Sequence, residues 1–216
     1  MSLFSLSGLG FSYDSGRPVL AGLDFALAAG ERVAVVGANG TGKTTLLHLM
    51  VGLLHPQAGT VTAFGRERRS EEDFIEVRAR AGLLFQDPDD QLFCPTVAED
   101  VAFGPLNLGL GRAEAARRVD ETLEALGIPE FRDRVAIRLS GGEKRLVTLA
   151  TVLSMRPEVL LLDEPSNALD EKALERLLAI LEGLPQAMVM VSHDRRVVDR
   201  LATRRVELRH GKFIVP

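Results

Sequence analysis

The chain has 216 residues, of which 46% are hydrophobic and 26% charged, and its formal net charge is −4. Such a composition is typical of an ordinary globular protein, large enough for one domain or for one domain with an inserted subdomain. The mildly acidic charge argues against a general binder of nucleic acid or of anionic membranes, the single cysteine excludes an intrachain disulfide, and no apolar run reaches the roughly 18 residues of a membrane span.

Short apolar segments near the start of the chain predict four strands and a helix. The strands are expected at 3–6 and 10–13, on either side of a turn, and at 19–27 and 32–36. The last is a continuous apolar run, which is typical of a buried parallel strand because both of its faces are covered. Leucine and methionine at helical spacing then predict a helix over 44–54.

The middle of the chain, from about 96 to 154, is predicted to be mostly helical. Apolar residues at helical spacing indicate a helix over 112–126, which Gly127 ends, and a second helix over 146–153. We interpret this block as a helical subdomain inserted into the rest of the chain.

The last third returns to alternating strands and helices. Strands are expected at 159–162 and 187–191, with a helix over 171–184 between them, and a hairpin of strands 205–208 and 212–215 ends the chain. Both long strands are followed by polar residues. This plan predicts an α/β fold, with a ligand bound at the edge where the parallel strands end.

A complete phosphate-binding (Walker A) pattern lies between the strand at 32–36 and the helix that follows. Glycines let backbone N–H groups converge on phosphate oxygens, and the helix N-terminus adds a partial positive charge. Lys43 would contact the β- and γ-phosphates, and the Thr44 hydroxyl would contact Mg²⁺. A structural turn is the alternative, but strand, loop and helix are in the order that binding requires. The candidate ATP-binding residues are Gly37, Ala38, Asn39, Gly40, Thr41, Gly42, Lys43, Thr44 and Thr45.

Two carboxylates, Asp163 and Glu164, follow the strand at 159–162, which we expect beside the strand that carries the Walker A loop. Asp163 would hold Mg²⁺ through water, because Mg²⁺ keeps much of its hydration shell. Glu164 would orient and deprotonate the attacking water. A solvated turn is the usual interpretation of a lone Asp-Glu pair, but the Walker A pattern favours catalysis.

A second phosphate-binding device is predicted at the run 139–144, where a serine hydroxyl and glycine N–H groups precede a helix. The same residues fit a simple helix cap, with the serine as N-cap and a glutamate at the capping-box position. The candidate residues are Ser140, Gly141, Gly142 and Glu143.

With these motifs in this order, the chain resembles the ATPase subunits of ABC transporters over essentially its whole length. The resemblance implies that Tyr13 stacks on adenine, that Gln86 contacts Mg²⁺ beside a transmembrane partner, and that His193 senses the γ-phosphate. It identifies 166–170 as the D-loop, which contacts the opposite subunit. Glu143 replaces the glutamine that is commoner in the family signature, which removes no catalytic group.

The resemblance also implies the fold and the chemistry as a whole. We expect an α/β P-loop NTPase core of the ABC ATPase type, with a small antiparallel β-subdomain and an inserted helical subdomain. Residues 1–216 would form a single domain, with the nucleotide-binding core at 1–87 and 155–216 and the helical signature subdomain at about 88–154. The implied cofactors are ATP and Mg²⁺. The implied catalytic residues are Glu164, His193 and Gln86, and the implied Mg²⁺ contacts are Thr44, Gln86 and Asp163.

A narrower resemblance, carried by 85–93 and 95–109, is to the ATPases of energy-coupling-factor importers, which take up cobalt, nickel or vitamins such as biotin. We favour cobalt. The implied assembly is a head-to-tail homodimer, or a heterodimer with a similar ATPase, at the cytoplasmic face of the cell membrane. It would be attached through membrane scaffold and substrate-binding subunits, with no nucleic-acid partner.

The segment 86–104 is where we expect a membrane subunit to dock, in a groove with an apolar floor and an acidic rim. A solvated loop leading into an amphipathic helix is the alternative. The expected floor residues are Leu92, Phe93, Val97, Val101 and Phe103, and the expected rim residues are Asp87, Asp89, Asp90, Glu99 and Asp100.

Other P-loop proteins fit the sequence less well. Chromosome-maintenance and DNA-repair members of the ABC family insert a long coiled coil between Walker A and the signature, whereas here about 95 residues intervene without sustained heptads. Translation-factor members carry two ATPase domains in one chain. A small-molecule kinase has no need of the signature or the D-loop. Co-purified membrane proteins would favour a transporter, and ribosomes or DNA would oppose it.

Overall fold

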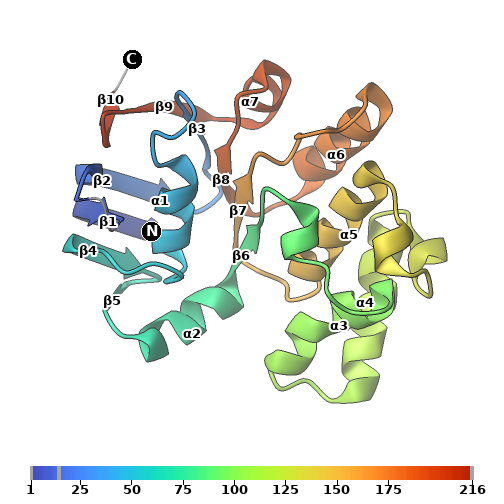
Figure 1. Cartoon of the computed structure of the whole chain (residues 1–216). Coiled ribbons are helices and arrows are strands. Elements are labelled where there is room, and N and C mark those ends of the chain that lie inside the picture. The colour runs from blue at the N-terminus through green and yellow to red at the C-terminus, as the bar shows by residue number, and fades with distance from the viewer. Residues whose placement is uncertain (1, 14–15, 215–216) are drawn as a thin grey trace. The chain divides into compact units, whose positions relative to one another are not determined.

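The computed structural model describes residues 2–13 and 16–214, and its larger sheet has six strands in the order β10-β9-β3-β8-β7-β6 (Figure 1). Strands β3, β8, β7 and β9 run parallel, and β10 pairs antiparallel with β9. The bounds are β3 Arg32–Val36, β6 Ala81–Leu84, β7 Val159–Asp163, β8 Ala187–Val191, β9 Arg204–Arg209 and β10 Lys212–Ile214. The expected α/β plan is therefore present.

One expectation about this sheet is wrong. Strand β7, which carries Asp163, does not lie beside the Walker A strand β3, because β8 lies between them and pairs with both. Chain order does not fix strand order in parallel sheets, since each connection crosses over a face and can skip a position. The carboxyl ends of all three strands still meet at one edge. Of the expected hairpin, Val215 lies outside the described residues.

The smaller sheet is antiparallel, with four strands in the order β2-β1-β4-β5. The bounds are β1 Ser2–Ser12, β2 Pro18–Ala28, β4 Ala58–Ala63 and β5 Arg66–Arg68. The two short strands expected at 3–6 and 10–13 form the single strand β1. Gly8 has a φ of 58°, and the pairing of β1 with β2 shifts register between Leu6 and Leu9, so a bulge breaks the alternation without ending the strand.

Helix α1, Lys43–Met50, follows β3 and is shorter than the expected 44–54. It ends before Gly52, which has a φ of 71° and whose added Cβ would lie 2.2 Å from Cγ of Phe74. Phe74 belongs to α2, Glu71–Arg80, which a Ser70–Asp73 capping box starts. A short helix α7, Arg195–Leu201, follows β8.

A single apolar core joins the two sheets and α1. It contains fully buried residues from β1 (Phe4), β3 (Val33 and Val35), α1 (Leu46) and β8 (Val189). This core fixes the end of β3 relative to the start of α1, which is where the Walker A loop lies. These elements belong to one compact unit, made of residues 1–83, 158–164 and 185–216.

A second compact unit contains residues 84–157 and 165–184 and is mainly helical. Its helices are α3 Val97–Asn107, α4 Arg112–Ala125, α5 Gly141–Leu153 and α6 Glu171–Gly183. Helix α5 starts five residues before the expected 146, because Ser140 caps it. Helices α3 and α4 each pack against α5, as does α6. Within the described residues, no helix is both long and apolar enough to span a bilayer.

Candidate functional site

The loop between β3 and α1 has a backbone that requires its glycines. Gly37, Gly40 and Gly42 have φ values of 150°, 75° and 100°, a region that residues with a Cβ rarely adopt. A Cβ on Gly37 would lie 2.5 Å from the carbonyl oxygen of Leu208, and a Cβ on Gly42 would lie 2.6 Å from Cγ1 of Val19. Between them, 38–40 form an exposed turn. The loop therefore brings backbone, not bulky side chains, to the N-terminus of α1.

Lys43 is the first residue of α1 and is 7% exposed. Its ammonium donates to the carbonyl oxygens of Gly37, at 2.9 Å, and Ala38, at 3.0 Å. The Thr41 hydroxyl also donates to Ala38, at 2.9 Å. These bonds hold a full positive charge beside a helix N-terminus that has a partial one. Such an arrangement attracts a polyanion such as a triphosphate.

Asp163, the last residue of β7, is buried and accepts a hydrogen bond from the Thr44 side chain. Burial raises the pKa of Asp163; the Thr44 hydrogen bond opposes this, and the charge of neighbouring Glu164 adds to it. Its Oδ1 atom is buried and has no hydrogen-bond partner among the described residues. An unpartnered buried carboxylate oxygen beside a threonine hydroxyl fits Mg²⁺, which prefers oxygen ligands.

Glu164 and His193 form a contact that joins the ends of two neighbouring strands, β7 and β8. Oε2 of Glu164 lies 2.8 Å from Nδ1 of His193 and accepts the backbone N–H of His193 at 3.3 Å. The Glu164 N–H donates to Val191 at 2.9 Å. Glu164 has a φ of 43°, which is strained for a residue with a side chain. The surroundings therefore fix a buried carboxylate in one place, with an exposed imidazole against it.

Tyr13 lies beside the Walker A helix. Its hydroxyl is 3.1 Å from Oγ1 of the buried Thr45, and its ring makes an edge contact with Phe11 at 4.9 Å. The side chain is 49% exposed. Anchoring through the hydroxyl and an edge leaves a ring face for stacking. Thr45 was predicted to contact the nucleotide. In the structure its hydroxyl contacts the Tyr13 hydroxyl, and a contact with the nucleotide stays a prediction.

The run 140–143 starts helix α5 with a capping box. The Glu143 N–H donates to Oγ of Ser140 at 3.4 Å, and the Ser140 N–H donates to the Glu143 carboxylate at 2.8 Å. Arg134 pairs with the same carboxylate at 2.6 Å. The Arg134 hydrogen bond and the Ser140 N–H lower the pKa of Glu143 to about 2. Gly142 allows a close approach, since its added Cβ would lie 3.0 Å from that of Ala173 on α6.

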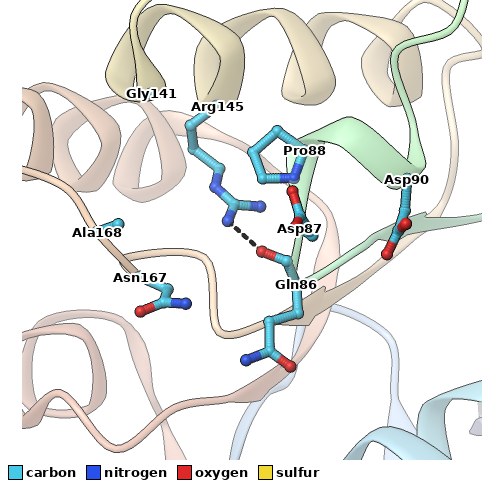
Figure 2. Close-up of a pocket in the computed structure, with 8 residues that line it drawn as sticks. All are labelled: Gln86, Asp87, Pro88, Asp90, Gly141, Arg145, Asn167 and Ala168. Atoms are coloured by element: carbon cyan, nitrogen blue, oxygen red, sulfur yellow. Dashed lines mark hydrogen bonds between the residues drawn. The ribbon is translucent and has the colours of Figure 1, made fainter.

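Gln86 is exposed and lines a pocket of about 430 Å³ in the second unit (Figure 2). The pocket brings the segment after β6 together with the start of α5 and the D-loop. Its Arg145 donates to the backbone carbonyl of Gln86, as the dashed line in Figure 2 shows. The lining residues are Gln86, Asp87, Pro88, Asp90, Gly141, Arg145, Asn167 and Ala168.

A second pocket, of about 540 Å³, lies in the region where a groove was expected. Phe93, 64% exposed, stands at this pocket and packs edge-on against Phe103 at 4.8 Å. Ile137, 81% exposed, also lines this pocket. The lining residues are Asp89, Leu92, Phe93, Cys94, Pro95, Val135, Ala136 and Ile137.

Of the ten residues expected in this groove, Asp89, Leu92 and Phe93 line the pocket, and three of the others are buried. Val97 and Val101 are fully buried in the helical unit and do not form the groove floor. Asp100 is 3% exposed and is not a rim residue. Its Oδ1 accepts the N–H groups of Phe93, at 3.1 Å, and Cys94, at 2.9 Å, so the acid holds the groove segment from inside. Val97, Asp100 and Val101 follow helical spacing, so all three lie on the buried face of α3.

Sequence reasoning overlooked Arg145 and Gln91. Arg145 immediately precedes the mostly apolar run 146–150 of α5, and a charged residue on the buried face of a helix was the available signal. Gln91 bonds to Thr148 and Thr151 of the same helix. No sequence signal distinguishes it from an exposed glutamine.

Comparison with known protein families adds one match, to the family model described as ABC transporter, over residues 20–167. A Brucella suis protein, provisionally named an ABC transporter ATP-binding protein, is 58% identical over 98% of this chain and 88% of its own length. The cobalt import ATP-binding protein CbiO of Rhodobacter capsulatus is 46% identical over 98% of this chain and 77% of its own. The energy-coupling factor transporter ATP-binding protein EcfA of Methanothermobacter thermautotrophicus is 43% identical over 98% and 70%.

A solved structure of cbiO1 from Clostridium perfringens, described as part of the ABC transporter complex cbiONQ, superposes with a TM-score of 0.88. It is 32% identical and covers 99% of this chain and 87% of its own. A dimeric ATP-binding cassette with 24% identity superposes with a TM-score of 0.89 over 98% of this chain and 97% of its own, and it shows the same fold.

Proposed function

We propose that this chain energises an energy-coupling-factor importer whose cargo is cobalt. The chain belongs to the ABC transporter family and is an ATP-hydrolysing subunit of that family. The observation that carries this proposal is the 46% identity, over 98% of the chain, to a cobalt import ATP-binding protein. Similarity to EcfA and to cbiO1 supports the same class of transporter.

In the proposed ATP site, the Walker A loop holds the triphosphate. The free N–H groups at the start of α1 would donate to phosphate oxygens, and the Lys43 ammonium, already fixed by two loop carbonyls, would add the nearest full charge. The exposed face of Tyr13 stacks on the adenine. Stacking discriminates poorly between bases, so the loop supplies most of the affinity.

Thr44 and Asp163 would hold Mg²⁺ in this site, with Gln86 as a further contact. The buried, unpartnered Oδ1 of Asp163 and the Thr44 hydroxyl beside it are the observed features that fit such a cation. When bound there, Mg²⁺ would supply positive charge that offsets the negative charge of the phosphate oxygens.

Glu164 is the proposed general base. Its carboxylate oxygen is held by two donors of His193, which leaves the other oxygen to take a proton from water. His193 orients that carboxylate, and because its side chain is exposed, it is also available to the γ-phosphate. Together the two strand ends would position the water in line with the scissile bond.

The signature at 140–143 would complete the ATP site of a second subunit. The start of α5 offers glycine N–H groups and a serine hydroxyl, which is a phosphate-binding arrangement. A head-to-tail dimer, with an identical or a similar ATPase, places this helix start against the partner's nucleotide. ATP closes the dimer only because it binds the closed state more tightly than the open one.

The groove lined by Phe93 and Ile137 would receive a helix of the membrane scaffold subunit. Large exposed apolar side chains in one place are typical of protein interfaces. A docked helix that carries arginine would pair with an acid such as Asp89, which lines this groove. Through this contact the subunit would sit at the cytoplasmic face of the membrane, next to the scaffold and substrate-binding subunits.

The test is affinity purification of the tagged chain from its own membranes, followed by mass spectrometry and cobalt uptake measurements. We expect scaffold and substrate-binding membrane proteins with the wild type, and uptake that depends on Glu164. Phe93→Ala should lose these partners while ATP binding stays normal. Leu53→Ala is a matched control, since Leu53 is also exposed but belongs to the other unit. Recovery of ribosomes or DNA, or uptake of nickel or a vitamin without cobalt, would contradict the proposal.

A further inference from the structure

Arg145 is the largest of the fully buried side chains in the described chain, with 1% exposure. Its two terminal nitrogens donate to carbonyl oxygens of consecutive residues: Nη1 to Phe85 at 2.7 Å and Nη2 to Gln86 at 2.6 Å. Figure 2 shows the second of these bonds. Burying a guanidinium is unfavourable unless it is well hydrogen-bonded. The arginine is therefore placed here by a specific contact with the chain at Phe85 and Gln86.

The contact fixes the direction of the backbone after β6. In an extended strand, successive carbonyl groups point to opposite sides. One planar guanidinium can reach both carbonyls only if the chain turns between Phe85 and Gln86. Strand β6 ends at Leu84, so the guanidinium holds the turn that follows it. Because the Gln86 side chain is exposed and unpacked, its position depends on this backbone turn.

The same face of α5 holds the segment at a second point. Gln91 donates to the Thr148 carbonyl at 3.0 Å and to the Thr151 hydroxyl at 2.7 Å, and its own oxygen accepts the Phe85 N–H at 3.2 Å. Positions 145, 148 and 151 are spaced by three and share one side of the helix. Helix α5 thus fixes Phe85 through both its N–H and its carbonyl group.

We propose that Arg145 is a positioning residue that sets the place of Gln86 and, through it, the rate of ATP hydrolysis. The proposal rests on the proposed role of Gln86 at the Mg²⁺ and attacking water. It also implies that the two ATP sites of a dimer are coupled through α5. Arg145 lies one turn beyond the capped start of α5, so a shift of Ser140 against the partner's ATP would move the Gln86 that serves the subunit's own ATP.

The test is a double-mutant cycle on steady-state ATP hydrolysis, with nucleotide affinity and Tm measured in parallel. Arg145→Met removes the charge and the bonds to Phe85 and Gln86, and Arg145→Lys keeps the charge but lacks the planar fork of two terminal nitrogens that makes these two bonds. We expect Arg145→Met to lower kcat about 10- to 100-fold, the usual loss when a residue that orients a metal contact is removed. KM for ATP should stay unchanged, since the Walker A loop is untouched. In the Gln86→Ala background, Arg145→Met should cause no further loss.

Arg68→Met is the matched control, because Arg68 is also a buried arginine that donates to backbone carbonyls, of Ala63 and Asp73. It should lower Tm but not kcat. If Arg145→Met does not fold, Arg145→Lys should still show the loss of kcat that disappears without Gln86. An equal loss with and without Gln86, or an unchanged kcat, overturns the inference alone. A normal kcat in Gln86→Ala overturns the proposed role of Gln86 itself.

Discussion

Replacing Glu164 with glutamine should stop ATP hydrolysis while the nucleotide still binds. The wild-type carboxylate accepts two hydrogen bonds from His193, at 2.8 Å and 3.3 Å. The amide oxygen of glutamine can accept both, and glutamine adopts the same positive φ at the same strain. The substitution therefore keeps the geometry and removes only the base.

The expected magnitude follows from that single loss. General-base catalysis contributes about 10²- to 10⁴-fold, which corresponds to about 2.7 to 5.4 kcal/mol of activation free energy at about 1.36 kcal/mol per decade. A Glu164→Ala variant loses the hydrogen bonds to His193 as well. Its turnover should be no higher than that of Glu164→Gln, and its Tm should be lower.

Phosphate release in a single turnover, with ATP affinity measured by a fluorescent nucleotide, separates the chemical step from binding. We expect Glu164→Gln to bind ATP as the wild type does and to accumulate unhydrolysed ATP. A wild-type single-turnover rate in this variant would show that another group accepts the proton. Loss of ATP binding would show that Glu164 acts on the nucleotide and not on water.

Three further substitutions test other parts of the site. Lys43→Ala should weaken ATP binding and abolish hydrolysis, because the phosphates lose their nearest fixed cation; a normal affinity by titration would place the nucleotide elsewhere. In a Glu164→Gln background, ATP should shift the protein to a dimer in light scattering. Ser140→Arg should block the shift, whereas Ser140→Ala, which removes the hydroxyl without adding bulk, should weaken it less. Burial raises the pKa of Asp100. The protonated carboxyl therefore stabilises the fold below the pKa of the unfolded chain, and this contribution is lost as pH rises through the folded pKa. Asp100→Asn should remove this part of the pH dependence of Tm, and a plot of Tm against pH that matches the wild type would contradict the assignment.

Strands buried on both faces were the elements that the sequence predicted best. For β3 and β8 the expected bounds, 32–36 and 187–191, are those observed. Both are apolar runs; the run of β3 ends at Gly37 and that of β8 at the polar Ser192, so the local sequence marks their ends. The order of the sheet was not predictable in this way, since the position of β8 between β3 and β7 depends on crossovers that leave no local pattern.

The region from 55 to 84 received no prediction, although it contains β4, β5, α2 and β6. Strands β4 and β5 lie at one edge of the small sheet, and most of their side chains are exposed or half-buried. Apolar periodicity is therefore weak in both. The capping box of Ser70 and Asp73 was a usable signal for α2, but it has aspartate where the usual pattern has glutamate or glutamine.

The candidate site was predicted residue by residue from motifs, but its contacts were not. The bond between Glu164 and His193 joins residues 29 apart that meet only because β7 and β8 are neighbours. The buried Asp100 shows the opposite limit. Its charge made it look like a rim residue, whereas it accepts two N–H groups of the segment that presents Phe93.

For the signature, a helix cap and a phosphate site were treated as alternatives; the structure shows the cap, and the phosphate site stays a prediction with which this cap is compatible. As N-cap, Ser140 uses an oxygen lone pair to accept the Glu143 N–H, and its side chain also hydrogen-bonds the Glu143 carboxylate. Glu143 stays ionised, with a pKa of about 2, because Arg134 and the Ser140 N–H hold it. A negative charge next to a phosphate site would repel the ligand, and Arg134 compensates for it. Glutamate in place of the commoner glutamine is therefore compatible with phosphate binding as long as Arg134 is present.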